Sequence, residues 1–206
     1  MAARTKKTAG FVGRDPECTR LRILESALKE FAASGFAGAR VSRIARRAKI
    51  NKRMLYHYFE DKEGLFRAVL HHKISERRSS VEAQASELDP ASCLSIWFKQ
   101  NCLDSDWVRL LAWESLQTVK DLVLDEKERR RIAQAAAARI REKQKAGSLR
   151  ADVPAPFLQL ARISLSMFPT ALPQLTRVIT GSSPQNPKFQ REYARFLETI
   201  SAAFRP

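Results

Sequence analysis

Two short amphipathic segments joined by a tight connection constrain the fold of this chain more than any other feature. In residues 40–66, apolar side chains recur at the i, i+3, i+4, i+7 spacing of one helical face, and further apolar anchors follow a short break. The anchors are Val41, Ile44, Ala45 and Ala48, then Ile50, Leu55 and Phe59. Cationic side chains fill many positions between them: Arg43, Arg46, Arg47, Lys49, Lys52 and Arg53. The pattern predicts two helices clamped at a fixed angle with a cationic outer face, a helix-turn-helix suited to DNA.

The flanking segments extend this unit. The apolar spacing over residues 20–34 predicts a first helix, which Gly35 ends with a left-handed cap. A further helix is expected from Lys62 to about Ser75, with Asp61 as its N-cap. Residues 20–78 are therefore predicted to form a helix-turn-helix domain with a connecting helix.

Charge is concentrated in the same part of the chain. Residues 1–78 hold 19 Lys and Arg against 8 Asp and Glu, and so supply most of the formal net charge of +15. This local excess favours nucleic acid as the partner of the N-terminal part. Residues 1–19, with Arg4, Lys6, Lys7 and Arg14, are predicted to be a flexible basic arm, either a disordered start or an arm that enters the minor groove.

From residue 79 onward the pattern is helical throughout, which predicts an all-α protein with a larger antiparallel helical bundle over residues 79–206. Helices are expected at 91–103, 105–122, 125–146, 155–168 and 188–204. The segment 155–168 is apolar on more than one face, so a second copy of the chain is expected to cover part of it. Pro169 predicts that this helix ends or bends near Phe168.

The quoted motifs resemble one family. They are similar to the DNA-binding domain of tetracycline-repressor-type (TetR) regulators. The resemblance is carried by the first helix with Ile23, Leu24, Ala27 and Phe31, the Gly35-Phe36 pair, the anchors Val41, Ile44-Ala45 and Ala48, and the run Leu55-Tyr56-His57-Tyr58-Phe59 before Lys62-Glu63 and Leu65. The chain departs from the family at two positions. Lys49 stands at the usual turn glycine, and Arg40 at the usual small hydroxyl residue that starts the second helix.

The resemblance implies a homodimer that binds a palindromic DNA operator, most simply as a repressor released by a small-molecule effector. The three cysteines are odd in number and spaced unlike a zinc site or a disulfide framework, which favours a reducing cytoplasm. The third helix should read the major groove, with Lys52, Arg53 and His57 as candidates for base edges because Arg can grip guanine by two bonds. By resemblance, Tyr56 and Lys62 contact phosphates, and Arg40, Ser42, Arg43 and Tyr58 lie near the DNA backbone.

The C-terminal part carries the expected effector and dimer sites. Its aromatic residues and one unusual carboxylate predict a ligand pocket formed by Trp97, Phe98, Trp107, Leu111, Trp113, Glu114, Phe157 and Phe168. Glu114 would lie at the solvent edge, pair with an arginine such as Arg162, or receive a cationic or hydrogen-bond-donating ligand. The family pairs through its last two helices, which implies a dimer interface through Leu160, Ile163, Met167, Tyr193, Phe196, Leu197 and Ile200.

Other functional classes find less support. No Ser/His/Asp or Cys/His set can be assembled, and His71 and His72 are adjacent, so they point about 100° apart on a helix. We therefore expect no enzyme activity, no metal and no cofactor. Two alternatives remain: a thiol redox-sensing regulator that uses Cys93 and Cys102, and a basic helical scaffold for RNA or acidic proteins. No apolar run approaches the roughly 18 residues that a membrane span requires.

Overall fold

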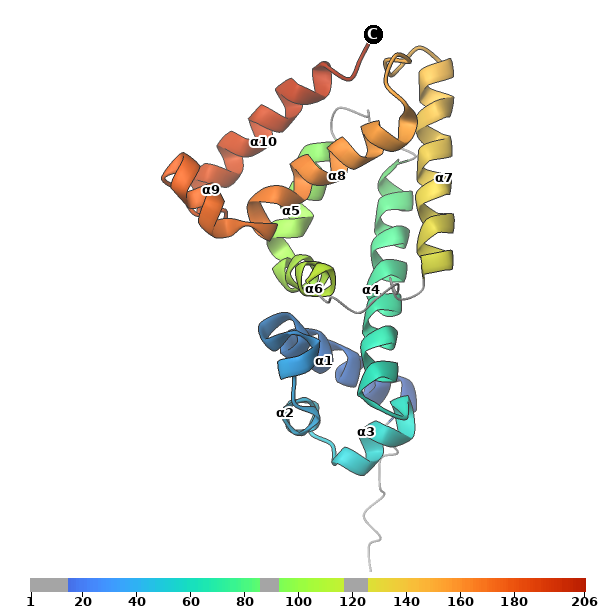
Figure 1. Ribbon diagram of the computed structural model, residues 1–206, viewed down its shortest axis with the longest axis vertical. Helices are drawn as coiled ribbons and strands as arrows, with labels where there is room; N and C mark the ends of the chain where they lie inside the picture. The colour runs from blue at the N-terminus through green and yellow to red at the C-terminus, as the bar shows by residue number, and fades with distance from the viewer. Residues whose placement is uncertain (1–14, 86–92, 117–125) are drawn as a thin grey trace, which may run out of the picture.

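The computed structural model describes residues 15–85, 93–116 and 126–206, and side chains except those of residues 78–85. Within these ranges the chain forms ten helices and no strand, so the predicted all-α class is confirmed. Three helices make an N-terminal domain, and six later helices make the larger C-terminal domain (Figure 1). One long helix, α4 (Lys62–Ala85), runs from the first domain into the second.

The N-terminal domain is built from α1 (Pro16–Gly38), α2 (Val41–Arg47), α3 (Lys52–Phe59) and the first turns of α4. The apolar positions expected from the sequence meet in one core, in which Ile23, Leu24, Ala27, Phe31, Ile44, Leu55 and Leu65 are fully buried. Because Asp15 caps α1, residues 16–19 belong to a helix rather than to the predicted arm. The remainder of the predicted arm, residues 1–14, lies outside the described residues.

Gly35 interrupts α1, as its sequence position predicted. Its φ of 66° and ψ of 176° are not helical, and the chain continues for one more short turn to Gly38. A methyl group on Gly35 would lie 2.8 Å from Cε3 of Trp113, which comes from the other domain. Only glycine fits here, because the site combines positive φ with the close approach of an indole ring.

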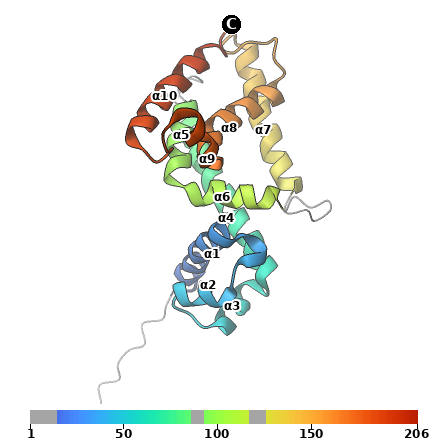
Figure 2. The same cartoon turned by 60° about the vertical axis from the view of Figure 1, so that its left-hand side comes forward.

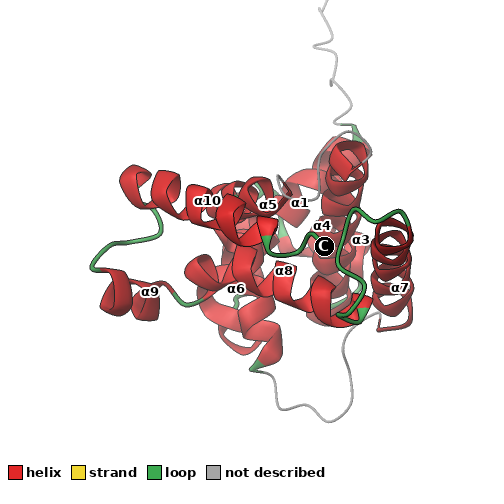
Figure 3. Cartoon of the chain, turned by 90° about the horizontal axis from the view of Figure 1, so that it is seen from above, coloured by secondary structure: helices red, strands yellow, loops and turns green. Residues whose placement is uncertain are grey.

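The C-terminal domain contains α5 (Cys93–Leu103), α6 (Ser105–Ser115), α7 (Glu126–Lys145), α8 (Ala155–Ala171), α9 (Pro173–Thr180) and α10 (Pro187–Ala202). The predicted 105–122 helix is described as helical only to Ser115, and residues 117–125 lie outside the described part. Viewed from above, α7 and α9 lie at opposite edges of the domain (Figure 3). The short helix α9 was not predicted from the sequence.

Helix α8 does not end at Phe168 but continues through Pro169 to Ala171. A proline has no amide hydrogen, so the carbonyl of Leu165, four residues earlier, loses its helical donor. The hydroxyl of Tyr193 on α10 donates to that carbonyl at 3.0 Å. The replaced hydrogen bond explains why the helix tolerates the proline.

Helix α6 joins the two domains. It crosses α1 in the turned view (Figure 2), and its Trp107, Val108 and Leu110 are buried in the same core as the N-terminal helices. Trp113 donates its indole hydrogen to the carbonyl of Ala32 on α1 at 3.2 Å. Because of these contacts, a shift of α6 would also displace α1. Among the described helices, none has the length and apolar character that crossing a membrane would require.

Candidate functional site

Helix α3 presents a cationic face to solvent. Lys52, Arg53 and His57 are exposed, while Leu55 and Phe59 on the opposite face are buried in the core. Tyr56 is also exposed, and Tyr58 is half-buried. The helix can therefore offer its polar side chains to a groove of DNA without disturbing its packing.

The connection between α2 and α3 is held by backbone geometry and one cap. Lys49 adopts a φ of 53°, the left-handed conformation in which the family uses glycine. Asn51, which the sequence analysis did not single out, accepts a hydrogen bond from the amide of Met54 at 2.7 Å. Asparagine just before a helix is a recognisable N-cap, so this signal was available in the sequence.

The start of α2 depends on a buried carboxylate from α1. Glu30 is only 3% exposed, and it accepts a hydrogen bond from the backbone amide of Arg40 at 3.1 Å. The guanidinium of Arg43 lies 3.6 Å from the same carboxylate. Glu30 therefore satisfies the backbone amide of the N-cap residue Arg40, as the Glu of a capping box does, while the Arg40 side chain itself makes no cap. Ser42 on the next turn is exposed.

Lys62 fixes the beginning of α4 against the turn that follows α1. Its ammonium group donates to the carbonyl of Ala37 at 3.3 Å and lies 4.9 Å from the centre of the Phe36 ring. Asp61 caps the same helix through the amide of Gly64 at 2.7 Å, as predicted. Lys62 therefore has a structural role besides the phosphate contact that the resemblance implies.

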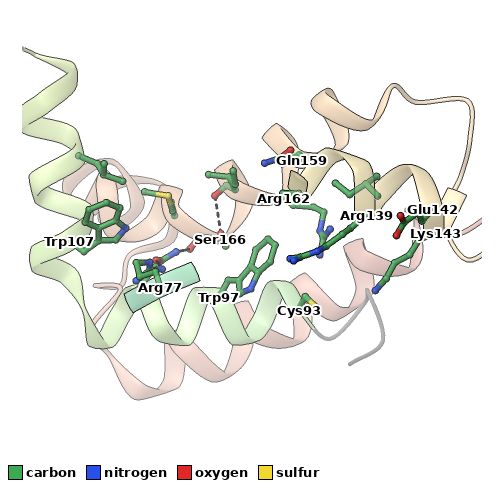
Figure 4. Close-up of a pocket in the computed structure, with 16 residues that line it drawn as sticks. Arg77, Cys93, Trp97, Trp107, Arg139, Glu142, Lys143, Gln159, Arg162 and Ser166 are labelled. Atoms are coloured by element: carbon green, nitrogen blue, oxygen red, sulfur yellow. Dashed lines mark hydrogen bonds between the residues drawn. The ribbon is translucent and has the colours of Figure 1, made fainter. Parts of the chain in front are cut away.

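The C-terminal domain encloses a cavity of about 650 Å³ (Figure 4). Three of the predicted pocket residues line it, namely Trp97, Trp107 and Leu111. Ile163 and Met167, which were predicted to lie at the dimer interface, also line it. The other lining residues are Arg77, Cys93, Asn101, Ala136, Arg139, Ile140, Glu142, Lys143, Gln159, Arg162 and Ser166.

The remaining predicted pocket residues lie elsewhere. Phe98 is fully buried in a separate core with Phe189 and Leu197. Trp113 lies against α1 at the domain junction, and Phe157 is 66% exposed. Phe168 borders a second hollow of about 340 Å³ between α8, α9 and α10. Helical spacing predicted that these side chains lie on helices, but it could not determine which neighbour each helix face would meet.

Glu114 does not face the cavity either. Its carboxylate accepts a hydrogen bond from Arg129 on α7 at 2.6 Å, and both side chains are largely buried. The sequence analysis expected an arginine partner but named Arg162, which instead lies with its guanidinium 4.7 Å from the centre of the Trp97 ring. Glu114 is therefore paired with a cation from its own chain, Arg129, and not with a cationic ligand.

Apart from Ile163 and Met167, which line the cavity, the predicted dimer residues divide into three groups. Leu160 and Phe196 are exposed, so they are available to a second copy of the chain. Tyr193 and Ile200 are half-buried, and the hydroxyl of Tyr193 is used by α8. Leu197 is fully buried in its own chain and is not available to a partner, because it packs into the α5–α10 core.

A polar network underlies the cavity and reaches α4. Arg77 donates to the side-chain oxygen of Asn101 at 2.6 Å, and the Asn101 amide donates to the Ser166 carbonyl at 3.0 Å. Lys73 contacts Asp104 at 2.6 Å and Glu76 at 2.9 Å. Burial alone would lower the pKa of Lys73, but the bonds to both carboxylates outweigh it and raise the pKa. The network connects the cavity to the helix that enters the N-terminal domain.

Comparison with known proteins identifies the family. Residues 23–69 match the model of bacterial regulatory proteins of the tetR family, and residues 96–199 match the tetracyclin repressor-like C-terminal domain. The HTH-type transcriptional repressor SCO4008 of Streptomyces coelicolor is 32% identical over 168 residues, which cover 82% of this chain and 86% of the relative. This chain belongs to the TetR family.

Other relatives agree with that membership. The HTH-type transcriptional repressor NicS of Pseudomonas putida is 36% identical over 118 residues, which cover 54% of this chain and 55% of NicS. The transcriptional regulator SCO4942 of Streptomyces coelicolor superposes with a TM-score of 0.70 and 26% identity over 91% of this chain and 98% of the other. FadR of Bacillus subtilis, solved in complex with stearoyl-CoA, shares the fold with a TM-score of 0.65 at 16% identity, over 87% of this chain and 97% of FadR.

The TetR family is a family of ligand-responsive, DNA-binding transcriptional regulators, and this function was predicted from the motifs of residues 20–70. SCO4008 and NicS are named transcriptional repressors, which is a non-enzymatic role. The two family models match on either side of the expected domain boundary near residue 78.

Two of the three thiols of this TetR protein, those of Cys18 and Cys102, lie in surroundings that do not activate them. Burial raises the pKa of Cys102, although a hydrogen bond with Thr170 works against the rise. Cys93 is buried, and the pKa of the exposed Cys18 is raised mainly by its hydrogen bond to Asp15. Because the thiolate is the reactive form, the raised pKa of Cys102 disfavours this thiol as one half of the Cys93/Cys102 redox pair. Among the described residues, no three metal-binding side chains gather in one place.

Proposed function

We propose that this TetR protein is a repressor that binds a palindromic operator as a homodimer, and that a small molecule in the 650 Å³ cavity lowers its affinity for DNA. A protein with this role acts where the chromosome lies, so we place it in the bacterial cytoplasm. One observation carries the proposal. A single helix, α6, lines the cavity with Trp107 and Leu111 and contacts the N-terminal domain with Trp113.

The DNA side of the proposal uses the exposed face of α3. Lys52, Arg53 and His57 share the outer side of this helix and are placed to meet base edges. Arg40, Ser42 and Arg43 at the start of α2, together with Tyr56, Tyr58 and Lys62, are assigned to the phosphates and sugars. The assignment follows the usual division in which phosphate contacts position the protein and base contacts specify the sequence.

The dimer would form through an apolar surface on α8, α9 and α10. Leu160, Phe168, Ile179 and Phe196 are large apolar side chains that are exposed there. The second hollow runs between the same three helices, and its lining is almost wholly apolar. A surface of this kind is commonly covered by a partner, and a two-fold dimer is the simplest way to cover it.

The two halves of the mechanism are linked by α4 and α6. A ligand that pushes against Trp107 or Leu111 would shift α6, and Trp113 would pass the shift to Ala32 on α1. Arg77 on α4 lines the same cavity, so a ligand there would contact the connecting helix as well. Such a ligand lowers DNA affinity only if it binds more tightly to the arrangement of the two N-terminal domains that fits the operator poorly.

Selection from a random duplex library tests the DNA part of the proposal. We expect a roughly palindromic site with half-sites about one helical turn apart, or a multiple of it, bound by two chains. Affinity should fall by on the order of 10³-fold or more between 50 and 200 mM salt if about six phosphates or more are contacted. A flat salt dependence, or no preference over random duplex, would contradict the proposal.

A further inference from the structure

Arg162 is a buried arginine that faces the cavity. Its side chain is only 8% exposed, and none of the carboxylates in the described part of the chain forms an ion pair with it. Among the described residues it contacts the face of the Trp97 ring, 4.7 Å from the guanidinium, and the side chain of Cys93. An arginine stays charged in a protein, so this site holds a positive charge that the described carboxylates do not balance.

A buried charge of this kind is unfavourable unless an anion pairs with it. Taking a cation out of water is expensive, and a neutral ring and a thiol return only part of the lost solvation. The burial lowers the pKa of the Arg162 guanidinium, which reflects the same penalty. Since the cavity borders Arg162, a negatively charged group entering there would supply the missing partner.

The surroundings of Arg162 strengthen this argument. Of the titratable side chains that line the cavity, Arg139 and Lys143 lie toward the same end, together with the carboxylate Glu142 (Figure 4). Arg77 lies at the opposite end, where Asp104 at 3.7 Å and Asn101 at 2.6 Å already contact it. Arg77 therefore has both a carboxylate and an amide partner, whereas Arg162 has no carboxylate partner among the described residues.

Much of the remaining wall is apolar. Trp107 and Leu111 line the cavity from α6, Ile163 and Met167 from α8, and Ile140 from α7. A volume of about 650 Å³ accommodates a drug-sized molecule, since ligand pockets are typically about 300–1,000 Å³. The cavity therefore suits a molecule with an acidic head and an apolar body.

We propose that the effector is an amphipathic organic anion, whose carboxylate or phosphate group binds Arg162 and whose apolar body lies along Trp107, Leu111 and Met167. This inference rests on the proposed function, because it assumes that the cavity is the effector site. It reverses the charge that the sequence suggested for the ligand, since the one carboxylate expected there, Glu114, is paired with Arg129.

The test compares probes that share one tail and differ in the head group: decanoate, decyl phosphate, decanol and decylammonium. Isothermal titration calorimetry at neutral pH and below micelle-forming concentrations gives their affinities for the full chain. We expect at least one of the two anions to bind about tenfold or more tightly than decanol, and decylammonium to bind most weakly. The two anionic arms distinguish a carboxylate from a phosphate head. Tighter binding of decylammonium, equal binding of all four probes, or no binding by any of them would overturn the inference.

Two substitutions at the same position assign the effect to Arg162. Arg162→Met should weaken binding of the preferred anion about tenfold or more while changing decanol by less than about threefold. Arg162→Lys should retain much of the anion preference. The matched control is Arg141→Met on α7, which removes the same charge from an exposed position outside the cavity lining and should change neither affinity. If Arg162→Met fails to fold, the wild-type series and Arg162→Lys still decide the question.

The same samples separate this inference from the proposed function. Operator affinity is measured by fluorescence anisotropy with and without the preferred anion. If the anion binds through Arg162 and leaves operator affinity unchanged, the inference stands and the proposed release mechanism fails. If the protein binds its operator but shows no preference for anions, the inference fails and the DNA-binding part of the proposed function stands.

Discussion

Single side chains on α3 divide into those placed to read bases and those placed to hold phosphates. Arg53 and Tyr56 lie three positions apart on the exposed face, so both can meet DNA at once. Arg53→Ala should weaken binding to the selected operator by roughly 1–3 kcal/mol and relax the preference at one position in each half-site. Affinity measurements over a panel of single-base operator variants check this expectation.

Tyr56→Phe is the matched comparison, because it removes only a hydroxyl from the same face. It should weaken all duplexes equally, since phosphates carry no base identity. An Arg53→Ala protein that lost affinity uniformly over the panel would move Arg53 into the phosphate-binding group.

Glu114 stabilises the fold through its ion pair with Arg129, and it does not line the cavity. Glu114→Gln should lower the free energy of unfolding by about 1–2 kcal/mol, because it breaks a largely buried ion pair with Arg129. Glu126→Gln on the exposed Glu126–Arg130 pair is the control, and it should change stability by less than about 0.5 kcal/mol. Chemical denaturation of each variant gives the values. If Glu114→Gln left the stability unchanged but lowered the affinity for the ligand, the result would mean that the Glu114 carboxylate contacts the ligand in the cavity.

The two departures from the family motif show what a single sequence can and cannot predict about residues. The sequence located Lys49 at a position that needs positive φ, and the structure has it at 53°. The capping role of Glu30 could not be predicted, because Glu30 precedes Arg40 by ten residues and only the packing of α1 on α2 brings them together. Local rules find local partners, whereas a buried carboxylate shared between helices requires the fold.

Among the secondary-structure elements, the junction of α1 and α6 depends on Gly35. Gly35→Ala should destabilise the protein by about 2–4 kcal/mol, because the new methyl group meets the Trp113 ring at 2.8 Å and the positive φ is strained as well. Gly181→Ala is also at positive φ but has open space around it, so it should show only the smaller strain. Gly38→Ala has neither problem to a comparable degree.

Thermal unfolding of these three variants separates the two causes. Equal losses for Gly35→Ala and Gly181→Ala would mean that backbone strain alone explains the requirement for glycine, and that the contact with Trp113 contributes nothing. Operator binding should fall most for Gly35→Ala, since its clash lies between the two domains.

Helix boundaries were predictable wherever the apolar period was strong, and less so around prolines. The 155–168 helix was expected to end or bend near Phe168 because Pro169 removes a hydrogen bond, and the sequence does not reveal that Tyr193 replaces it from another helix. Helix α9 was missed because it is short and begins at Pro173 itself, although proline is favoured in the first turn of a helix. For α8, the deciding partner lies 28 residues farther along the chain.

For the whole molecule, the apolar surface on α8–α10 predicts a dimer that a single charge would disrupt. Ile179 is 68% exposed and borders the second hollow. Ile179→Glu should shift the protein from dimer to monomer and weaken operator binding, because each half-site would then be bound alone. Sedimentation equilibrium and operator titration measure the two effects.

The matched control for Ile179→Glu is Leu103→Glu at the end of α5. Leu103 is 88% exposed, lies outside the lining of both hollows, and allows the same change in charge and polarity. It should leave the protein dimeric. A monomeric wild-type protein would contradict the dimer prediction directly.

The position of Trp113 bears on how far the two parts of such regulators can be exchanged. By sequence this residue belongs to the C-terminal part, yet its indole hydrogen bonds to Ala32 and its ring fills the space left by Gly35. A hybrid sensor made by cutting near residue 78 and joining a foreign effector domain would lose this contact unless the new α6 carried a side chain of similar shape. Exchanging Ala32, Gly35 and Trp113 as one set should therefore give hybrids that still respond to ligand, whereas cuts at the domain boundary alone should give hybrids that bind DNA constitutively or fold poorly.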